Sequence, residues 1–109
     1  MGPVKYLTPE SAGSFWHWEN YVIAQAVTAS TGQIPRHALA LGLQVSKSRI
    51  TLVLQVSNRD EEAELDLDDI AGDLSALING EVEVCTKTLV RSAPQISPRD
   101  GVFWIYIVR

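Results

Sequence analysis

The sequence predicts an α+β domain in which four mainly antiparallel strands form a single layer and two helices cover one face of it. Three observations predict this class. Apolar residues recur every three or four positions in two segments and follow strand-like patterns in four others, and the six segments run in the order α-β-β-α-β-β. A length of 109 residues is typical of one domain, so we assign residues 1–109 to a single domain with its own core.

The first helix is predicted from an apolar stripe near the N-terminus. Its members lie three or four positions apart: Phe15, Trp18, Val22, Ala26 and Ala29. Thr8-Pro9-Glu10 is typical of a helix start, with a capping residue, a proline and then an acid. Ser14 is an alternative start, because Gly13 would weaken a helix interior. Gly32 and Pro35 are expected to end the helix.

A β-hairpin is expected next, because two segments of period-two alternation are joined by a short polar stretch. The alternating apolar residues are Leu39, Leu41, Leu43 and Val45 in the first segment and Ile50, Leu52, Leu54 and Val56 in the second. Ser46-Lys47-Ser48-Arg49 joins them. This stretch lacks the Asn-Gly pair that favours one turn type, so the type of turn stays open.

The second helix has the clearest apolar face, made by Leu67, Ile70, Ala71, Leu74, Leu77 and Ile78. Acids crowd its first turns, where the helix dipole favours them. Asn79-Gly80 is typical of a helix end. Residues Glu81 to Thr88 then alternate as a third strand, with Val82, Val84 and Thr86 on one face.

The last strand is an apolar and aromatic run from Gly101 to Arg109, which favours a central position in the sheet. Pro94 and Pro98 make the preceding segment, Ser92 to Asp100, an ordered surface loop beside the start of that strand. With both helices on one face, the other face of the sheet would be partly open. Its expected lining is Val53, Phe103, Ile105 and Ile107. Such a face usually needs a partner, for example a second copy of the chain in a homodimer.

The charges are distributed unevenly. Asp or Glu fills eight of the fourteen positions from Asp60 to Asp73, and no Lys or Arg occurs between Arg59 and Lys87. With Glu81 and Glu83, this region carries a formal charge of −10, whereas the nine basic and three acidic residues elsewhere give +6. Phosphates would repel the acidic region, so we expect no nucleic acid as a partner. A basic protein would be attracted to it.

Four of these acids are predicted to share one helix face, because Glu62, Asp66, Asp69 and Asp73 are spaced by four, three and four residues. We expect this face to lie opposite the apolar one. A solvated helix face is the simplest interpretation, and a docking surface for a basic protein is the functional one. Asp66-Leu67-Asp68-Asp69 has some likeness to a calcium loop but lacks the required Gly and Glu, so we expect no metal.

An aromatic cluster precedes the middle of the first helix, at Phe15-Trp16-His17-Trp18-Glu19-Asn20-Tyr21. Trp18 belongs to the apolar stripe, and Trp16 is expected near its edge. Anchoring of the core is the simplest interpretation. Alternatively Trp16, His17 and Tyr21 contact a ligand or partner, since Trp and Tyr are favoured interface residues.

The sequence contains no recognisable catalytic motif. Cys85 is the single cysteine, so it forms no internal disulfide, and no local pattern brings His17 or His37 to it. Phosphate-binding glycine loops, Gly-x-Ser-x-Gly, His-Glu-x-x-His and Cys-x-x-Cys are all missing from the sequence. We therefore expect a protein that is not an enzyme and needs no cofactor. A single cysteine is compatible with a reducing cytoplasm. The longest apolar runs, such as Ile50 to Val56, are too short to span a membrane, and Met1 to Thr8 does not resemble a secretory signal.

Residues 38–109 resemble small bacterial immunity proteins of polymorphic or contact-dependent toxin systems. The resemblance lies in the order of elements, the hairpin from Ala38 to Leu52, the acidic helix from Leu67 to Leu74, and the ending from Ile96 to Tyr106. It implies a cytoplasmic, non-enzymatic inhibitor that binds one cognate toxin domain and covers its active site or substrate groove. An acidic surface would suit a nuclease toxin, whose groove must be basic to hold phosphates.

The resulting expectation is an immunity-type protein that neutralises a basic toxin domain. Its partner-binding residues would be Glu62, Asp66, Asp69, Asp73, Arg99 and Trp16, with Arg99 supplying a secondary contact from the loop. The alternative is a small self-associating regulatory or ligand-binding domain, with a preformed pocket near Trp16, His17 and Trp104.

Overall fold

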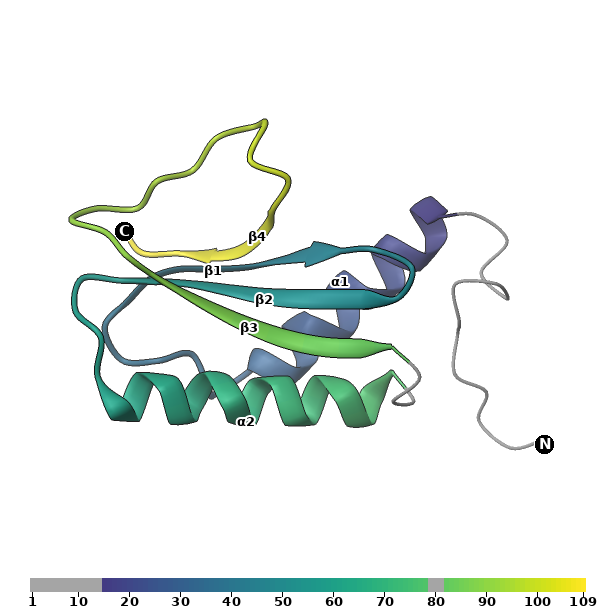
Figure 1. The fold of residues 1–109 in the computed structure, drawn as a ribbon, viewed down its shortest axis with the longest axis horizontal. Helices are drawn as coiled ribbons and strands as arrows, with labels where there is room; N and C mark the ends of the chain where they lie inside the picture. The colour runs from purple at the N-terminus through teal and green to yellow at the C-terminus, as the bar shows by residue number, and fades with distance from the viewer. Residues whose placement is uncertain (1–14, 79–81) are drawn as a thin grey trace.

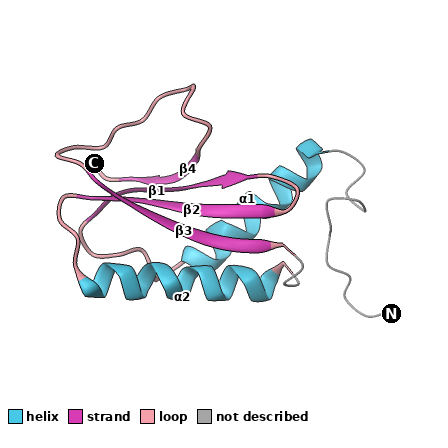
Figure 2. Ribbon diagram, in the orientation of Figure 1, coloured by secondary structure: helices cyan, strands magenta, loops and turns pink. Residues whose placement is uncertain are grey.

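The computed structural model describes residues 15–78 and 82–109, and within them it confirms the α+β class and the predicted order of elements. The sheet has four strands. Figure 1 shows that the helices lie on one side of it, and Figure 2 distinguishes helices, strands and loops by colour. The elements are α1 (Phe15–Ser30), β1 (Ala38–Val45), β2 (Arg49–Val56), α2 (Glu61–Leu77), β3 (Glu83–Val90) and β4 (Phe103–Ile107). The expected helix signals at Thr8–Glu10, Ser14 and Asn79-Gly80 lie outside the described residues. Gly32, with φ of 77°, follows the end of α1 as predicted.

The sheet is mixed, with the strand order β3-β2-β1-β4. β1 pairs antiparallel with β2 and with β4, whereas β2 and β3 are parallel. The parallel pair follows from the connection through α2, since a helix can carry the chain back to the end at which β2 began. β4 lies at an edge, so the expected central position for the last strand is wrong. Its apolar residues lie beside β1 at the edge of the sheet rather than in a central strand.

The core lies between the sheet and the two helices. From α1 it takes Trp18, Val22, Ala26 and Ala29, and from α2 it takes Ala63, Leu67, Ile70 and Leu74. The sheet contributes one alternating set, which includes Leu41, Leu43, Ile50, Leu52, Leu54 and Val56. Trp18 is fully buried, and its indole Nε1 donates to the Ser46 carbonyl at 3.2 Å, so this side chain ties α1 to the β-hairpin. The predicted apolar stripes of both helices are thus confirmed except at Phe15, which is 38% exposed and lies outside the core.

The β3–β4 loop, residues 91–102, crosses the sheet face that the helices leave uncovered. In Figure 1 this loop runs above the sheet. It must cross this face, because β3 and β4 lie at opposite edges. Gln55 of β2 anchors it. The amide Nε2 of Gln55 donates to the Gln95 carbonyl at 2.8 Å, and its Oε1 accepts from the Gln95 backbone N–H at 2.8 Å. Gln55 and Val53 are each only 2% exposed. The partner expected for this face is therefore the chain's own loop.

A β-bulge in β4 decides which of its residues reach the loop side of the sheet. The register shifts between Leu41 and Gly42, so that Trp104 stands opposite Gly42 and Tyr106 opposite Leu41. Ile105 and Tyr106 consequently both pack against the core on the helix side. Of the four residues expected on the uncovered face, Val53 and Ile107 lie there. Ile105 packs into the core and Phe103 aligns with buried Leu43, so these two expectations are wrong.

Two arginines cover part of the free edge of β3. In a parallel strand, alternate residues direct both backbone groups to the same side. The amides of Glu83 and Arg91 donate toward β2 and its flanking turn, so Thr88 and Val90 point outward. Arg59 Nη2 donates to the Thr88 carbonyl at 3.0 Å, and Arg91 Nη1 donates to the Val90 carbonyl at 2.9 Å.

Gly42 allows the close approach of β4, and this leads to a stability prediction. A Cβ at position 42 would lie 2.6 Å from Val102 Cγ1, 2.8 Å from the Phe103 carbonyl and 2.8 Å from Trp104 Cε3. We expect Gly42→Ala to lower the free energy of unfolding by about 1–3 kcal/mol, since backbone must move to make room. Gly72→Ala is the matched control: nothing lies within 4 Å of its Cβ, and it removes a helix glycine. It should raise the free energy by about 0.5–1 kcal/mol in urea unfolding. Equal effects of the two substitutions would contradict the close approach.

Candidate functional site

Acidic residues are concentrated at the start of α2, where the N-terminus of the helix stabilises negative charge. Asp60 is its N-cap: the backbone there is extended, and the side-chain Oδ1 accepts from the Ala63 N–H at 2.6 Å. Glu61, Glu62 and Glu64 occupy the first turn, where free N–H groups and the helix dipole favour negative charge. The acids of the first turn therefore stabilise the helix itself, which agrees in part with the simplest interpretation of the sequence, a solvated helix face.

The acidic stripe of α2, defined as Glu62, Asp66, Asp69 and Asp73, lies on the flank of the helix that faces α1. Asp73 Oδ2 accepts from Gln33 Nε2 at 2.6 Å, just beyond the end of α1. The expected position opposite the apolar face is wrong for a geometric reason. Each helical residue advances about 100° around the axis, so Asp66 lies about a quarter turn from buried Leu67.

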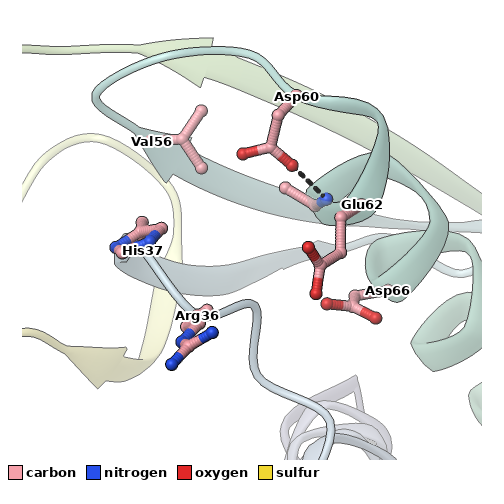
Figure 3. Close-up of a pocket in the computed structure, with 7 residues that line it drawn as sticks. Arg36, His37, Val56, Asp60, Glu62 and Asp66 are labelled. Atoms are coloured by element: carbon pink, nitrogen blue, oxygen red, sulfur yellow. Dashed lines mark hydrogen bonds between the residues drawn. The ribbon is translucent and has the colours of Figure 1, made fainter.

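Glu62 and Asp66 share a small hollow with the α1–β1 connection (Figure 3). Its volume is about 90 Å³, and Arg36, His37 and Val56 line the opposite side. This space holds a few water molecules rather than an organic ligand. No group of three or more His, Cys, Asp or Glu side chains within residues 15–78 and 82–109 is arranged to hold a metal ion.

Most α2 acids have no cationic partner in the described part of the chain. The two ion pairs there join Arg49 to Glu83 at 3.0 Å and Arg59 to Glu64 at 3.9 Å. Glu64 also accepts from the Thr88 hydroxyl at 3.2 Å, and its Oε1 is buried without a hydrogen bond, so this residue serves the contact between α2 and β3. The acids that remain without an ion pair include Glu61, Glu62, Asp66, Asp68 and Asp69. They form a surface of concentrated negative charge along α2.

The aromatic cluster divides between the core and the surface. Trp18 is buried and stacks on Tyr21, with ring centroids 5.9 Å apart, and the Tyr21 hydroxyl donates to the Leu77 carbonyl at 3.3 Å. Trp16 is 66% exposed, and its ring packs against the His17 ring with the ring centroids 5.3 Å apart. Trp16 is therefore available to a partner. The pocket expected near Trp16, His17 and Trp104 is not formed among the described residues, because Trp104 lies under the loop on the other side of the sheet.

Arg99 lies in the β3–β4 loop with an exposed side chain, and its backbone N–H donates to the Ser97 hydroxyl at 3.3 Å. The β3–β4 loop that carries Arg99 lies on the opposite side of the sheet from α2 (Figure 1), so the two parts of the predicted interface are not adjacent. Its neighbour Asp100 is engaged within the loop. Asp100 Oδ2 accepts from Ser97 N at 3.0 Å and from Trp104 Nε1 at 2.9 Å, and Oδ1 accepts from Val102 N at 3.0 Å.

Cys85 has the environment of a structural thiol. It lies in β3 opposite Thr51 of β2. Partial burial raises the pKa of the Cys85 thiol, and its hydrogen bond to the Glu83 carboxylate raises the pKa further. A nucleophilic cysteine requires the opposite shift. These surroundings are those of a half-buried packing residue.

No protein-family model matches the chain, and no curated protein matches it. The resemblance to immunity proteins accordingly stays a prediction. No helix in the described ranges is both long and apolar enough to cross a bilayer.

Sequence reasoning missed a second hollow, on the loop side of the sheet. It is lined by Lys87, Arg91 and Trp104, among others, and has a volume of about 320 Å³. The residues come from all four strands and from the β3–β4 loop. A usable signal was present in Gly42, since a glycine within a strand often marks the close approach of another group.

Asp100 provides a prediction about pH. The backbone N–H of Ser97, the Trp104 indole and the backbone N–H of Val102 hold the pKa of Asp100 below its ordinary value of 3.8. We expect Trp104→Phe to raise this pKa toward the ordinary value, as measured by the pH dependence of the Asp100 carboxyl carbon NMR signal. Trp16→Phe is the control, because it makes the same chemical change at an exposed site.

The sign of the effect on stability follows from the lowered pKa. The ionised Asp100 stabilises the fold fully above its unfolded pKa, and this stabilisation is lost as the pH falls through the lower folded pKa. Trp104→Phe should therefore reduce the part of acid unfolding that Asp100 causes. An Asp100 titration that Trp104→Phe leaves unchanged would show that the indole bond does not act on the carboxylate.

Proposed function

We propose that this protein is a cytoplasmic, non-enzymatic binding protein of the immunity type, which neutralises a cognate toxin domain by docking α2 on a basic surface. The observation that carries the proposal is the set of α2 acids without ion pairs, of which Glu61, Glu62, Asp68 and Asp69 are exposed and Asp66 is half-buried. A helix needs no more than a few acids at its N-terminus for stability. Asp66, Asp68 and Asp69 lie beyond the first turn, where mutual repulsion costs stability, so their charge is better explained by a partner.

The toxin's own chemistry supports the choice of a basic partner. A domain that cuts nucleic acid needs a positively charged groove to hold phosphates. An acidic helix with a formal charge comparable to a short stretch of phosphate backbone can occupy such a groove and block it. Charge complementarity would also accelerate the encounter, which matters for an inhibitor that must act before the toxin does.

The acidic stripe gives the first test of this proposal. We expect Glu62→Lys with Asp66→Lys to slow association with the toxin domain by about tenfold or more at low salt, and to reduce the salt dependence of the rate. Glu61→Lys with Asp68→Lys is the comparison pair. It changes the net charge equally on the same helix but on the flank away from α1, so a smaller effect of this pair would place the toxin on the acidic stripe, and an equal effect would extend the contact to both flanks of α2. Stopped-flow association rates at two salt concentrations measure both pairs.

The candidate toxin for this test is the polypeptide encoded directly upstream of the protein. Its C-terminal domain should arrest growth when expressed alone and should be tolerated when the protein is co-expressed. Arrest in both cases would reject the immunity function. Neutralisation with association rates that neither pair of substitutions changes would retain the function but remove α2 as its surface.

Arg99 tests how far the interface extends. As a secondary contact, Arg99→Ala should weaken partner binding by about 1 kcal/mol and leave unfolding unchanged, because its side chain is exposed. Isothermal titration of the same toxin domain measures this loss. Because Arg99 and α2 lie on opposite sides of the sheet, such a loss requires a partner that reaches around a sheet edge. An unchanged affinity would confine the interface to the helix side.

Self-association is the second candidate function, favoured by exposed apolar residues at the β4 edge. Phe103, Ile107 and Val108 are 38%, 46% and 37% exposed, respectively. A second copy could cover them as a regulatory homodimer. Sedimentation of the isolated protein separates the two functions, since a monomer at micromolar concentration counts against this one.

A further inference from the structure

The hollow on the loop side of the sheet combines an apolar floor with two cations. Leu89 of β3, Val102 of the β3–β4 loop and Trp104 of β4 supply apolar surface, and Lys87 and Arg91 supply positive charge. The volume of about 320 Å³ lies at the lower end of the range of about 300–1,000 Å³ that is usual for small-molecule sites.

The walls of this hollow are held in place by the fold. The reciprocal amide bonds between Gln55 and Gln95 fix the loop above the sheet. The Trp104 ring is held at one end by its bond to Asp100, at 2.9 Å, and rests on Gly42, where any Cβ would collide with it. A site that is already formed loses little conformational entropy when a ligand binds.

The two cations have no acidic partner in the described chain. Neither Lys87 nor Arg91 takes part in its ion pairs, which use Arg49 and Arg59 instead. One carboxylate, Asp100, lines the hollow, and both of its oxygens already accept hydrogen bonds from the loop and from Trp104. The hollow is thus positive, in a chain whose net charge is −4.

We propose that this hollow binds a small organic anion with a flat apolar body. The carboxylate or similar group would pair with Lys87 and Arg91, because charge-assisted hydrogen bonds are stronger than neutral ones. The body would lie against Trp104, Leu89 and Val102, where a ring gains stacking and apolar burial. This site lies on the opposite side of the sheet from α2, so the inference does not depend on the immunity function.

The test uses 2-naphthoate as the anionic probe and naphthalene-2-carboxamide as its neutral analogue, each titrated into the full chain. Calorimetry gives the affinity, and amide NMR spectra report the Trp104 indole N–H. We expect naphthoate to bind about tenfold or more tightly than the amide and to shift the Trp104 signal, since loss of a charge-assisted bond is worth at least that factor.

The variants are Lys87→Gln with Arg91→Gln, and, as a matched control, Arg36→Gln with Lys47→Gln. The first pair should lower naphthoate affinity about tenfold or more, and the control pair, whose residues lie outside the hollow, should not change it. Should Arg91→Gln disturb the β3 edge, Lys87→Gln alone decides, because Lys87 is exposed and makes no described hydrogen bond. Absence of naphthoate binding, equal binding of the neutral amide, or equal losses in the two pairs would overturn the proposal.

Discussion

The structure depends on one topological constraint: the chain must travel from the β3 edge of the sheet to the β4 edge after the helix layer is complete. Both helices pack against one face of the sheet, so the β3–β4 loop crosses the other face. Without an anchor, this segment would leave Val53 in contact with water. Gln55 supplies the anchor from the middle of the sheet, and its amide satisfies the two backbone groups that a crossing loop would otherwise leave unpaired. The burial of this face, the position of Trp104 and the second hollow all follow from that connection.

The net charge of the chain conceals two surfaces of opposite character. Negative charge is concentrated on α2, on the helix side, while Lys87 and Arg91 make the loop side locally positive. The sheet separates the two layers, so each surface can act on its own partner. One domain can therefore carry both proposed sites: an acidic surface for a protein on the helix side and a small positive hollow for an anion on the loop side.

Sequence patterns predicted the elements well where a local period was strong. The apolar spacing of α2, the hairpin of β1 and β2, and the buried role of Trp18 all depend on neighbours within a few residues, and they agree with the structure. Strand order could not be obtained in this way, because pairing β2 with β3 involves residues more than thirty positions apart. The bulge in β4 shifts two side chains to the same face, which a strict alternation cannot anticipate.

The candidate site shows the same division. The spacing of Glu62, Asp66, Asp69 and Asp73 correctly placed them on one line, but only packing against α1 decided which flank of the helix they occupy. The position of Arg99 on the far side depends on the path of the crossing loop, which has no local signal. The cavity beside Trp104 arises from four strands and a loop together, so no single segment could have revealed it.

The arginines at the β3 edge have a consequence for assembly of the chain into larger sheets. A free edge strand is a template on which further copies can add, and uncontrolled addition produces fibrils. Arg59 and Arg91 already occupy the outward carbonyls of Thr88 and Val90, so an incoming strand finds acceptors only toward Val84 and Thr86. A ladder of that length is too short to hold a second molecule by backbone bonds alone. Two positively charged side chains thus limit the addition of further strands at the β3 edge, where the sheet of the described residues ends.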